Sequence, residues 1–150
     1  MLVHIGLMTT EKEIAEGFKQ GFDCAMAVFG EVAESLGMDK EEAYRIASCF
    51  GVGMMQGSVC GAVSAAFLAI GYRYGNTKPN DMAQKNMLLA KREEFIERFT
   101  DEFGDIFCPG LLKLDLRIPE DMDEARKRKL LDEFCPKVCM HSINLIKEII

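Results

Sequence analysis

Apolar residues recur every three or four positions along most of the chain, which is the spacing that an amphipathic helix produces. In the first such segment Ile14, Phe18 and Phe22 fall on one face, and the capping box Thr10-Glu11-Lys12-Glu13 precedes them. No segment shows the alternation of apolar and polar residues that is typical of a strand. The pattern therefore predicts an all-α protein, a compact bundle of about six to seven helices in a single domain that spans residues 1–150.

Capping residues, glycines and prolines set the expected helix boundaries. Asp23, Asp39 and Ser58 are the expected N-caps of three helices, and Gly37 and Gly71 are expected helix ends. The expected helices cover residues 24–36, 40–49, 59–70, 81–103, 122–134 and 135–149, and a short turn or helix runs from Cys108-Pro109 to Leu112. The apolar side of the longest helix should consist of Leu89, Phe95, Ile96 and Phe99. The 59–70 helix should be central, with the 81–103 and 122–134 helices more exposed.

Between Arg45 and Arg73 the chain carries no charged side chain, over a length greater than the roughly 20 residues that span a bilayer. Glycines interrupt this stretch, most densely in Gly51-Val52-Gly53-Met54-Met55-Gln56-Gly57. Such a cluster would break a spanning helix in its middle, because glycine disfavours helix interiors. We therefore expect a helix end, a buried glycine-rich loop and a second buried helix, with no insertion into a membrane.

The charge balance limits the classes of binding partner that the sequence favours. The formal net charge of −6 argues against nucleic acid or an anionic membrane surface, because both bind basic patches. The one dense basic run, Arg126-Lys127-Arg128-Lys129, is interleaved with acidic residues and indicates a solvated helix face. The N-terminal segment Met1–Met8 lacks the basic flank and cleavage site of a signal peptide, so a cytoplasmic location is expected. A content of 49% hydrophobic residues is compatible with a homodimer.

The candidate chemistry comes from six cysteines in a chain that shows no sign of export. Four of them fall at expected helix starts: Cys24, Cys60, Cys108 and Cys135. A helix N-terminus carries partial positive charge and favours the thiolate, which attacks disulfides and binds soft metals. Cys49 and Cys139 are interpreted as small buried hydrophobes, although Cys135 and Cys139, four residues apart on one helix face, would also suit a pair of metal ligands.

The segment Cys60-Gly61-Ala62 is the sharpest local feature. Glycines before and within it would let the backbone come close to a bound group, and their N–H groups would stabilise a thiolate or an anion. The expected cofactor-binding glycines are Gly51, Gly53, Gly57 and Gly61. Neither His4 nor His141 has an identifiable partner, so the sequence gives little support to a Cys/His nucleophilic enzyme.

Five short motifs follow one another in a specific order and spacing. They are Asp-Cys-Ala-x-Ala-Val around Cys24, Phe-Gly-x-Gly-Met from Phe50, Cys-Gly-Ala-Val-x-x-Ala from Cys60, Phe-Cys-x-x-Leu-Leu from Phe107 and Cys-Pro-x-Val from Cys135. Together, from about residue 24 to the C-terminus, they resemble the C_GCAxxG_C_C family of redox-active proteins. The chain differs at Ala65, where the family motif Cys-Gly-Ala-x-x-Gly has its second glycine. Because alanine is also small, close helix packing should be kept there.

The resemblance implies a small bacterial or archaeal domain with four characteristic cysteines, which correspond to Cys24, Cys60, Cys108 and Cys135. Related domains occur attached to haem-carrying electron-transfer modules. The resemblance therefore also implies iron–sulfur ligation as one role for these cysteines.

Three functions stay open at the level of the sequence. The first is an iron–sulfur or other metal centre, such as zinc, that the four cysteines hold for electron transfer with an unknown redox partner. The second is metal-free thiol–disulfide chemistry, with Cys60 as the reactive thiolate and Cys24, Cys108 or Cys135 as its resolving partner. The third is a helical interaction module whose cysteines only pack the core.

Overall fold

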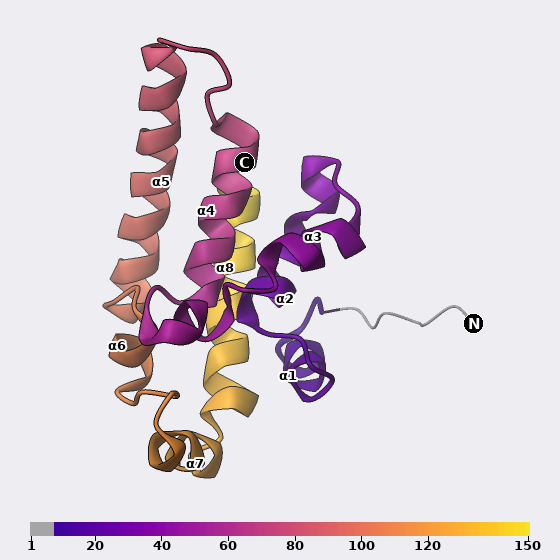
Figure 1. Ribbon diagram of the computed structural model, residues 1–150, viewed down its shortest axis with the longest axis vertical. Coiled ribbons are helices and arrows are strands. Elements are labelled where there is room, and N and C mark those ends of the chain that lie inside the picture. Colours follow the sequence, from indigo (N-terminus) through magenta and orange to yellow (C-terminus); the bar gives the residue numbers. More distant parts are fainter. Residues whose placement is uncertain (1–7) are drawn as a thin grey trace, which may run out of the picture.

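The computed structural model describes residues 8–150, and the regular structure within them is helical (Figure 1). His4 and the other residues that precede Met8 lie outside the described residues, and so do the expectations for them. The elements are α1 (Glu11–Lys19), α2 (Cys24–Val32), η1 (Glu34–Leu36), α3 (Lys40–Ala47), η2 (Gly53–Gly57), α4 (Gly61–Tyr74), α5 (Met82–Phe103), α6 (Cys108–Leu112), α7 (Pro119–Lys127), η3 (Leu130–Phe134) and α8 (Cys135–Ile149). The predicted all-α fold is confirmed.

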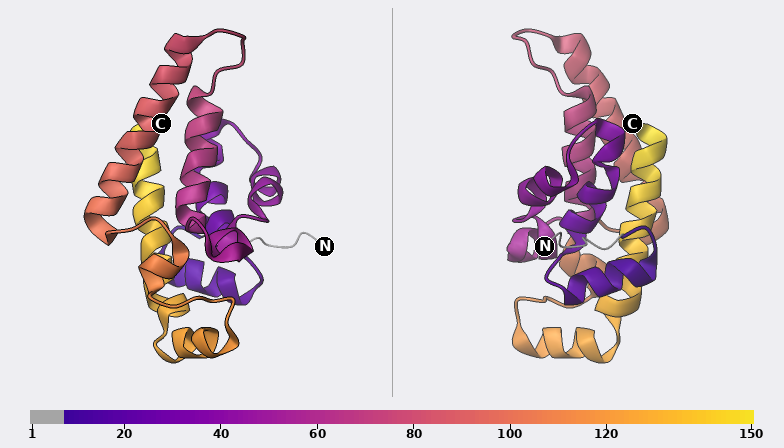
Figure 2. Two further views of the ribbon diagram at one scale, coloured as in Figure 1. Left: turned by 60° about the vertical axis from the view of Figure 1, so that its left-hand side comes forward. Right: turned by 90° about the vertical axis from the view of Figure 1, so that its right-hand side faces the viewer.

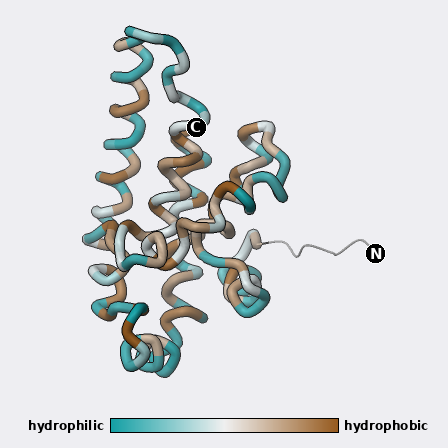
Figure 3. The backbone as a smooth tube through the Cα atoms, in the orientation of Figure 1, coloured by the Kyte–Doolittle hydropathy of each residue, from teal (hydrophilic) through white to brown (hydrophobic). Residues whose placement is uncertain are grey.

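Helix α4 occupies the centre of the fold, as the sequence predicts, and packs against α2, α5 and α8 (Figure 1). Its alanines Ala62, Ala65, Ala66 and Ala69 are fully buried, and small side chains let neighbouring helices approach closely. Apolar positions gather along α4 and α8, whereas α7 is largely hydrophilic (Figure 3). At the far end of the molecule α1 lies beside α8, and α7 packs against η3, the turn that leads into α8 (Figure 2).

Helices α5 and α7 are the more exposed ones, also as predicted. The buried residues of α5 are Phe95 and Phe99, both in its second half. Leu89 does not belong to the apolar side, because 43% of it is exposed, and its neighbour Leu88 packs against the core instead. The first half of α5 extends past the end of α8 (Figure 1).

The side chains of Thr10, Asp23 and Asp39 accept hydrogen bonds from backbone N–H groups one turn into α1, α2 and α3, as predicted. Gly37 ends the second helical segment with a left-handed φ of 69°. The expected continuous helix over 122–134 is wrong, because Lys129 adopts a left-handed φ of 57° and separates α7 from η3.

The prediction that Ser58 caps the central helix is also wrong. Ser58 and Val59 instead pair with residues 106–108, so that α4 begins at Gly61 with Cys60 as its N-cap residue. At the other end Gly71 stays helical, and α4 continues to Tyr74. Two hydrogen bonds hold this last turn: the Tyr74 hydroxyl donates to the Ile149 carbonyl at 2.9 Å, and the Gln84 amide donates to the Tyr74 carbonyl at 2.6 Å.

The glycine cluster forms a tight left-handed turn between α3 and α4. Val52, Gly53, Met54 and Met55 all have positive φ, from 54° to 60°, and Gly57 follows at 64°. Left-handed backbone is unfavourable for residues with a Cβ, so this turn interrupts the uncharged stretch as expected. Among residues 8–150 no helix has both the length and the apolar character that crossing a bilayer requires.

Candidate functional site

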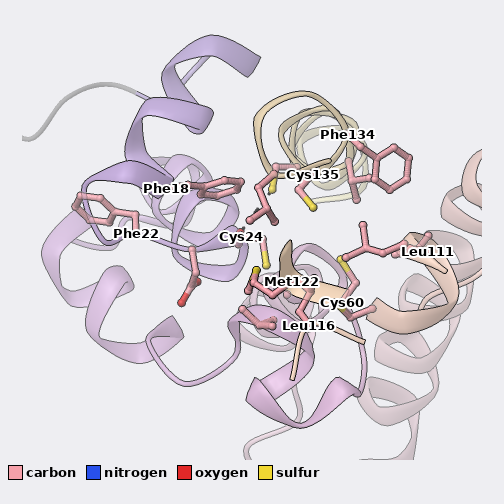
Figure 4. A pocket seen from close by; sticks show the side chains of 17 residues that line it. Phe18, Phe22, Cys24, Cys60, Leu111, Leu116, Met122, Phe134 and Cys135 are labelled. Atoms are coloured by element: carbon pink, nitrogen blue, oxygen red, sulfur yellow. Dashed lines mark hydrogen bonds between the residues drawn. The ribbon is translucent and has the colours of Figure 1, made fainter. Parts of the chain in front are cut away.

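The structure brings the four predicted cysteines together around one cavity of about 200 Å³ (Figure 4). Each cysteine comes from the beginning of a different helix. Cys24 is the first residue of α2, Cys60 precedes α4, Cys108 is the first residue of α6 and Cys135 is the first residue of α8. Residues that are far apart in the sequence therefore present four sulfur atoms to a common space.

A short antiparallel bridge between Val59 and Phe107 places Cys60 next to Cys108. The Cys60 N–H donates to the Ile106 carbonyl at 2.8 Å, and the Cys108 N–H donates to the Ser58 carbonyl at 2.9 Å. Because these bonds flank the two cysteines, the spacing between their backbones is fixed by the chain itself.

Cys135 differs from the other three in its backbone surroundings. It follows η3 without a break, and Phe134 before it already has helical φ and ψ angles of −81° and −54°. The N–H groups of the first turn of α8 therefore continue from a helical turn, and the expected free helix N-terminus at Cys135 is not formed. Pro136, which follows, lies in the first turn as the Phe-Cys-Pro motif predicts.

The cavity wall is apolar apart from the thiols. The other lining residues include Phe18, Phe22, Leu111, Leu116, Met122, Leu131 and Phe134, and Asp23 is the only charged residue among the described ones that line it. Within that lining no lysine, arginine or histidine offers a positive charge. Any thiolate formed here would have to rely on backbone dipoles or on a bound cation.

Burial consequently outweighs the helix-start effect on which the sequence argument relied. It raises the pKa of Cys108 to about 11 and raises the pKa values of Cys60 and Cys135 further above that of an ordinary thiol. Burial therefore opposes the thiolate form that the helix starts are expected to favour in these cysteines.

Cys24 receives the strongest backbone support. Burial raises the pKa of its thiol, but the N–H groups of Val52, Ala25 and Gly61 point at the sulfur and oppose that shift. Cys60, which the sequence suggested as the reactive thiolate, has only the Ala62 N–H in this role. Sequence reasoning missed this difference because Val52 and Gly61 reach Cys24 only through the fold.

The four predicted glycines have unequal positions. Gly61 lines the cavity, and a Cβ at this residue would overlap the Cys24 sulfur. Gly53 lies behind the wall, where its Cβ would come within 3.0 Å of the Cys108 Cβ. Gly51 packs on the Asp23 carboxyl group and Gly57 on the Arg117 guanidinium group, both outside the lining. Gly51, Gly53 and Gly57 therefore allow the elements around the cavity to pack closely.

The remaining two cysteines, Cys139 and Cys49, differ in burial. Cys139 is fully buried, as expected, but it also lines the cavity, and its thiol lies 3.9 Å from the Cys24 carbonyl. Cys49 is exposed, which contradicts the expected burial, because α3 ends at Ala47 and the following turn directs Cys49 outward. His141 packs its ring against Phe99 and Phe103 and does not line the cavity.

The thiols surround a volume and do not converge on one point. All six cysteines are free. Within residues 8–150 no three side chains of His, Cys, Asp or Glu are arranged to hold a single metal ion. A tetrahedral Zn²⁺ site, with Zn–S bonds of about 2.3 Å, would need sulfur atoms about 3.8 Å apart.

Comparison with known proteins identifies the family. A family model described as “Putative redox-active protein (C_GCAxxG_C_C)” matches residues 22–149. No curated protein and no solved structure matches the chain. The match begins just before Cys24, ends within the last turn of α8 and covers all four cysteines that share the cavity. The chain belongs to the C_GCAxxG_C_C family.

Proposed function

We propose that the protein is an electron-transfer domain in which Cys24, Cys60, Cys108 and Cys135 hold an iron–sulfur cluster. The observation that carries this proposal is the convergence of four thiols, from four helix starts, on one apolar cavity. Four cysteine thiolates are the usual ligand set of [2Fe–2S] and [4Fe–4S] clusters. Such a cluster supplies one-electron transfer when it is bound.

The size and the shape of the ligand arrangement favour a cluster over a single metal ion. The sulfur atoms border a cavity of about 200 Å³, and no three described ligands are placed for one ion. A group with several metal atoms spans more space than a single ion does. The four cysteine thiols and the volume of the cavity therefore both suit an iron–sulfur cluster.

The absence of a cationic side chain from the described lining supports a metal ligand role in another way. A reactive thiolate is usually stabilised by a neighbouring Lys, Arg or His, and the lining contains none. Coordination to a metal deprotonates a thiol outright. A bound metal would therefore displace the protons that burial favours on the free thiols.

The surrounding residues would hold and tune the bound group. Phe18, Leu116 and Phe134 border the cavity and would exclude water from it (Figure 4). The three N–H groups at Cys24 would donate to its ligating sulfur, which raises the reduction potential of a cluster. Gly61 makes room for that sulfur at the backbone.

Metal-free thiol–disulfide exchange is the second candidate, and one observation favours it. The N–H groups of Val52, Ala25 and Gly61 would stabilise a Cys24 thiolate, and Cys60 borders the same cavity as a resolving thiol. Mild oxidation should then produce one defined disulfide, detectable by mass spectrometry, between Cys24 and Cys60.

Metal analysis of anaerobically purified protein tests the main proposal. We expect iron and acid-labile sulfide, a visible absorbance band and an electron paramagnetic resonance (EPR) signal after reduction. Cys60→Ala should abolish all four signals, whereas Cys49→Ala, which changes an exposed cysteine away from the cavity, should leave them unchanged. Protein that contains no iron, and takes up none when iron and sulfide are supplied, would refute the proposal.

A further inference from the structure

The cavity contains five thiols, one more than the four cysteines of the family pattern. The fifth is Cys139, which is 0% exposed and borders the same space as the other four. Its thiol faces only a weak acceptor, the Cys24 carbonyl at 3.9 Å. Because a thiol is a poor hydrogen-bond donor, little free energy is lost when this contact is given up.

Cys139 lies one turn after Cys135 on the same face of α8. Four residues of α-helix advance the chain by about 6 Å and return it to nearly the same direction. The two sulfur atoms therefore border the cavity at successive levels, with Cys135 nearer its partly exposed rim and Cys139 in the core.

We propose that Cys139 is a fifth sulfur donor that replaces Cys135 as a metal ligand when Cys135 is lost or blocked. This inference rests on the proposed iron–sulfur function. With Cys135 present, the exchange would break one metal–sulfur bond at Cys135 and form one at Cys139, and the Cys139 proton would pass to the released Cys135 thiolate. With Cys135 absent, Cys139 would take the open ligand position and its proton would pass to water. In neither case would an electron be transferred.

The other three cysteines have no comparable substitute. Cys60 and Cys108 are fixed by the Val59–Phe107 bridge on a different part of the wall, and Cys24 by its N–H contacts at the start of α2. Cys135 lacks both of these constraints, since η3 runs directly into it. A shift of one ligand along α8 leaves the remaining three in place.

Three variants test this inference: Cys135→Ala, Cys139→Ala and Cys135→Ala/Cys139→Ala. Each is purified anaerobically and reconstituted with ferrous iron and sulfide, and bound iron and the EPR spectrum of the reduced protein are measured. Cys139→Ala measures the effect of losing the fifth thiol while Cys135 is present. Cys135→Ala should keep most of its iron with a changed EPR spectrum, and the double variant should bind about fivefold less.

Cys135→Ala/Cys49→Ala is the matched control, since Cys49 is exposed, and it should resemble Cys135→Ala. Cys135→Ser, read alongside circular dichroism, distinguishes loss of a ligand from loss of folding. The inference is overturned if the folded Cys135 variants bind no iron while wild type does, or if the double variant binds as much as Cys135→Ala. Wild type that binds no iron refutes the proposed function itself.

Discussion

The backbone of Gly61 lies directly against the sulfur of Cys24, so that a Cβ on Gly61 would overlap that atom. This contact lets the Gly61 N–H reach the sulfur and joins the first residue of α4 to the first residue of α2. It explains physically why glycine follows cysteine in the Cys60-Gly61-Ala62 segment.

Gly61→Ala should displace the Cys24 side chain. We expect the free energy of unfolding to fall by about 1–3 kcal/mol, the usual cost of an added methyl group in a packed interior. Bound iron should fall as well. Gly71→Ala is the matched control in the same helix, because a Cβ there meets no atom within 4 Å, and it should raise stability by about 0.5–1 kcal/mol. Equal stability and iron content in the two variants would contradict the close contact.

Alkylation should distinguish the cysteines by exposure. In the folded metal-free protein, iodoacetamide should modify Cys49 first, because Cys49 is exposed, while Cys60 and Cys139 should react only after denaturation. Peptide mass spectrometry over a time course gives the order. Labelling of Cys60 as fast as that of Cys49 would show that the cavity is open to solvent.

The metal-free protein should lose stability in alkaline solution. Burial raises the pKa of Cys108 to about 11, above that of an unfolded thiol near 8.5. The folded state therefore favours the protonated form, and this contribution is fully present below about pH 8.5 and lost as the pH rises through about 11. Urea unfolding at pH 8 to 11 should show a smaller decline for Cys108→Ala than for wild type. Equal declines in the free energy of unfolding of the two proteins would contradict the raised pKa of Cys108.

A glycine in place of Met55 should reduce the backbone strain of the left-handed turn. Met55 has a φ of 55° and is 55% exposed, so Met55→Gly removes backbone strain and few contacts. We expect it to raise the free energy of unfolding by about 0.5–1 kcal/mol. Met87→Gly, at a 50% exposed position inside α5, should lower that free energy by about 1 kcal/mol. Thermal unfolding of both variants measures these changes. If both substitutions lower the stability, the left-handed backbone at Met55 is contradicted.

Much of the fold could be predicted because its signals are local. Asp23 and Asp39 cap helices through side chains that reach N–H groups three residues ahead, and such contacts can be read from neighbouring residues. Ser58 carries the same local signal, but its backbone pairs with the segment that contains Cys108. A long-range pairing of this kind leaves no trace in the local pattern.

The same distinction applies to the site. The grouping of Cys24 with Cys60 follows from the family motifs, whereas the burial that raises the pKa values of their thiols depends on which apolar side chains surround them. Helix periodicity also assigns Leu89 to a buried position, and the cysteine side chain favours burial of Cys49, but both residues are exposed. Periodicity predicts which residues share the apolar face of a helix, but not how much of that face a neighbouring element covers.

The bridge between Val59 and Phe107 closes a loop that contains α4 and α5. Both Cys60 and Cys108 are at the base of this loop, while the connection between the two helices lies at its far tip (Figure 1). The length of the helical arm is therefore independent of the spacing between these cysteines. Adding or removing equal numbers of turns in the outer parts of α4 and α5 would change the reach of the molecule and leave the sulfur cavity intact.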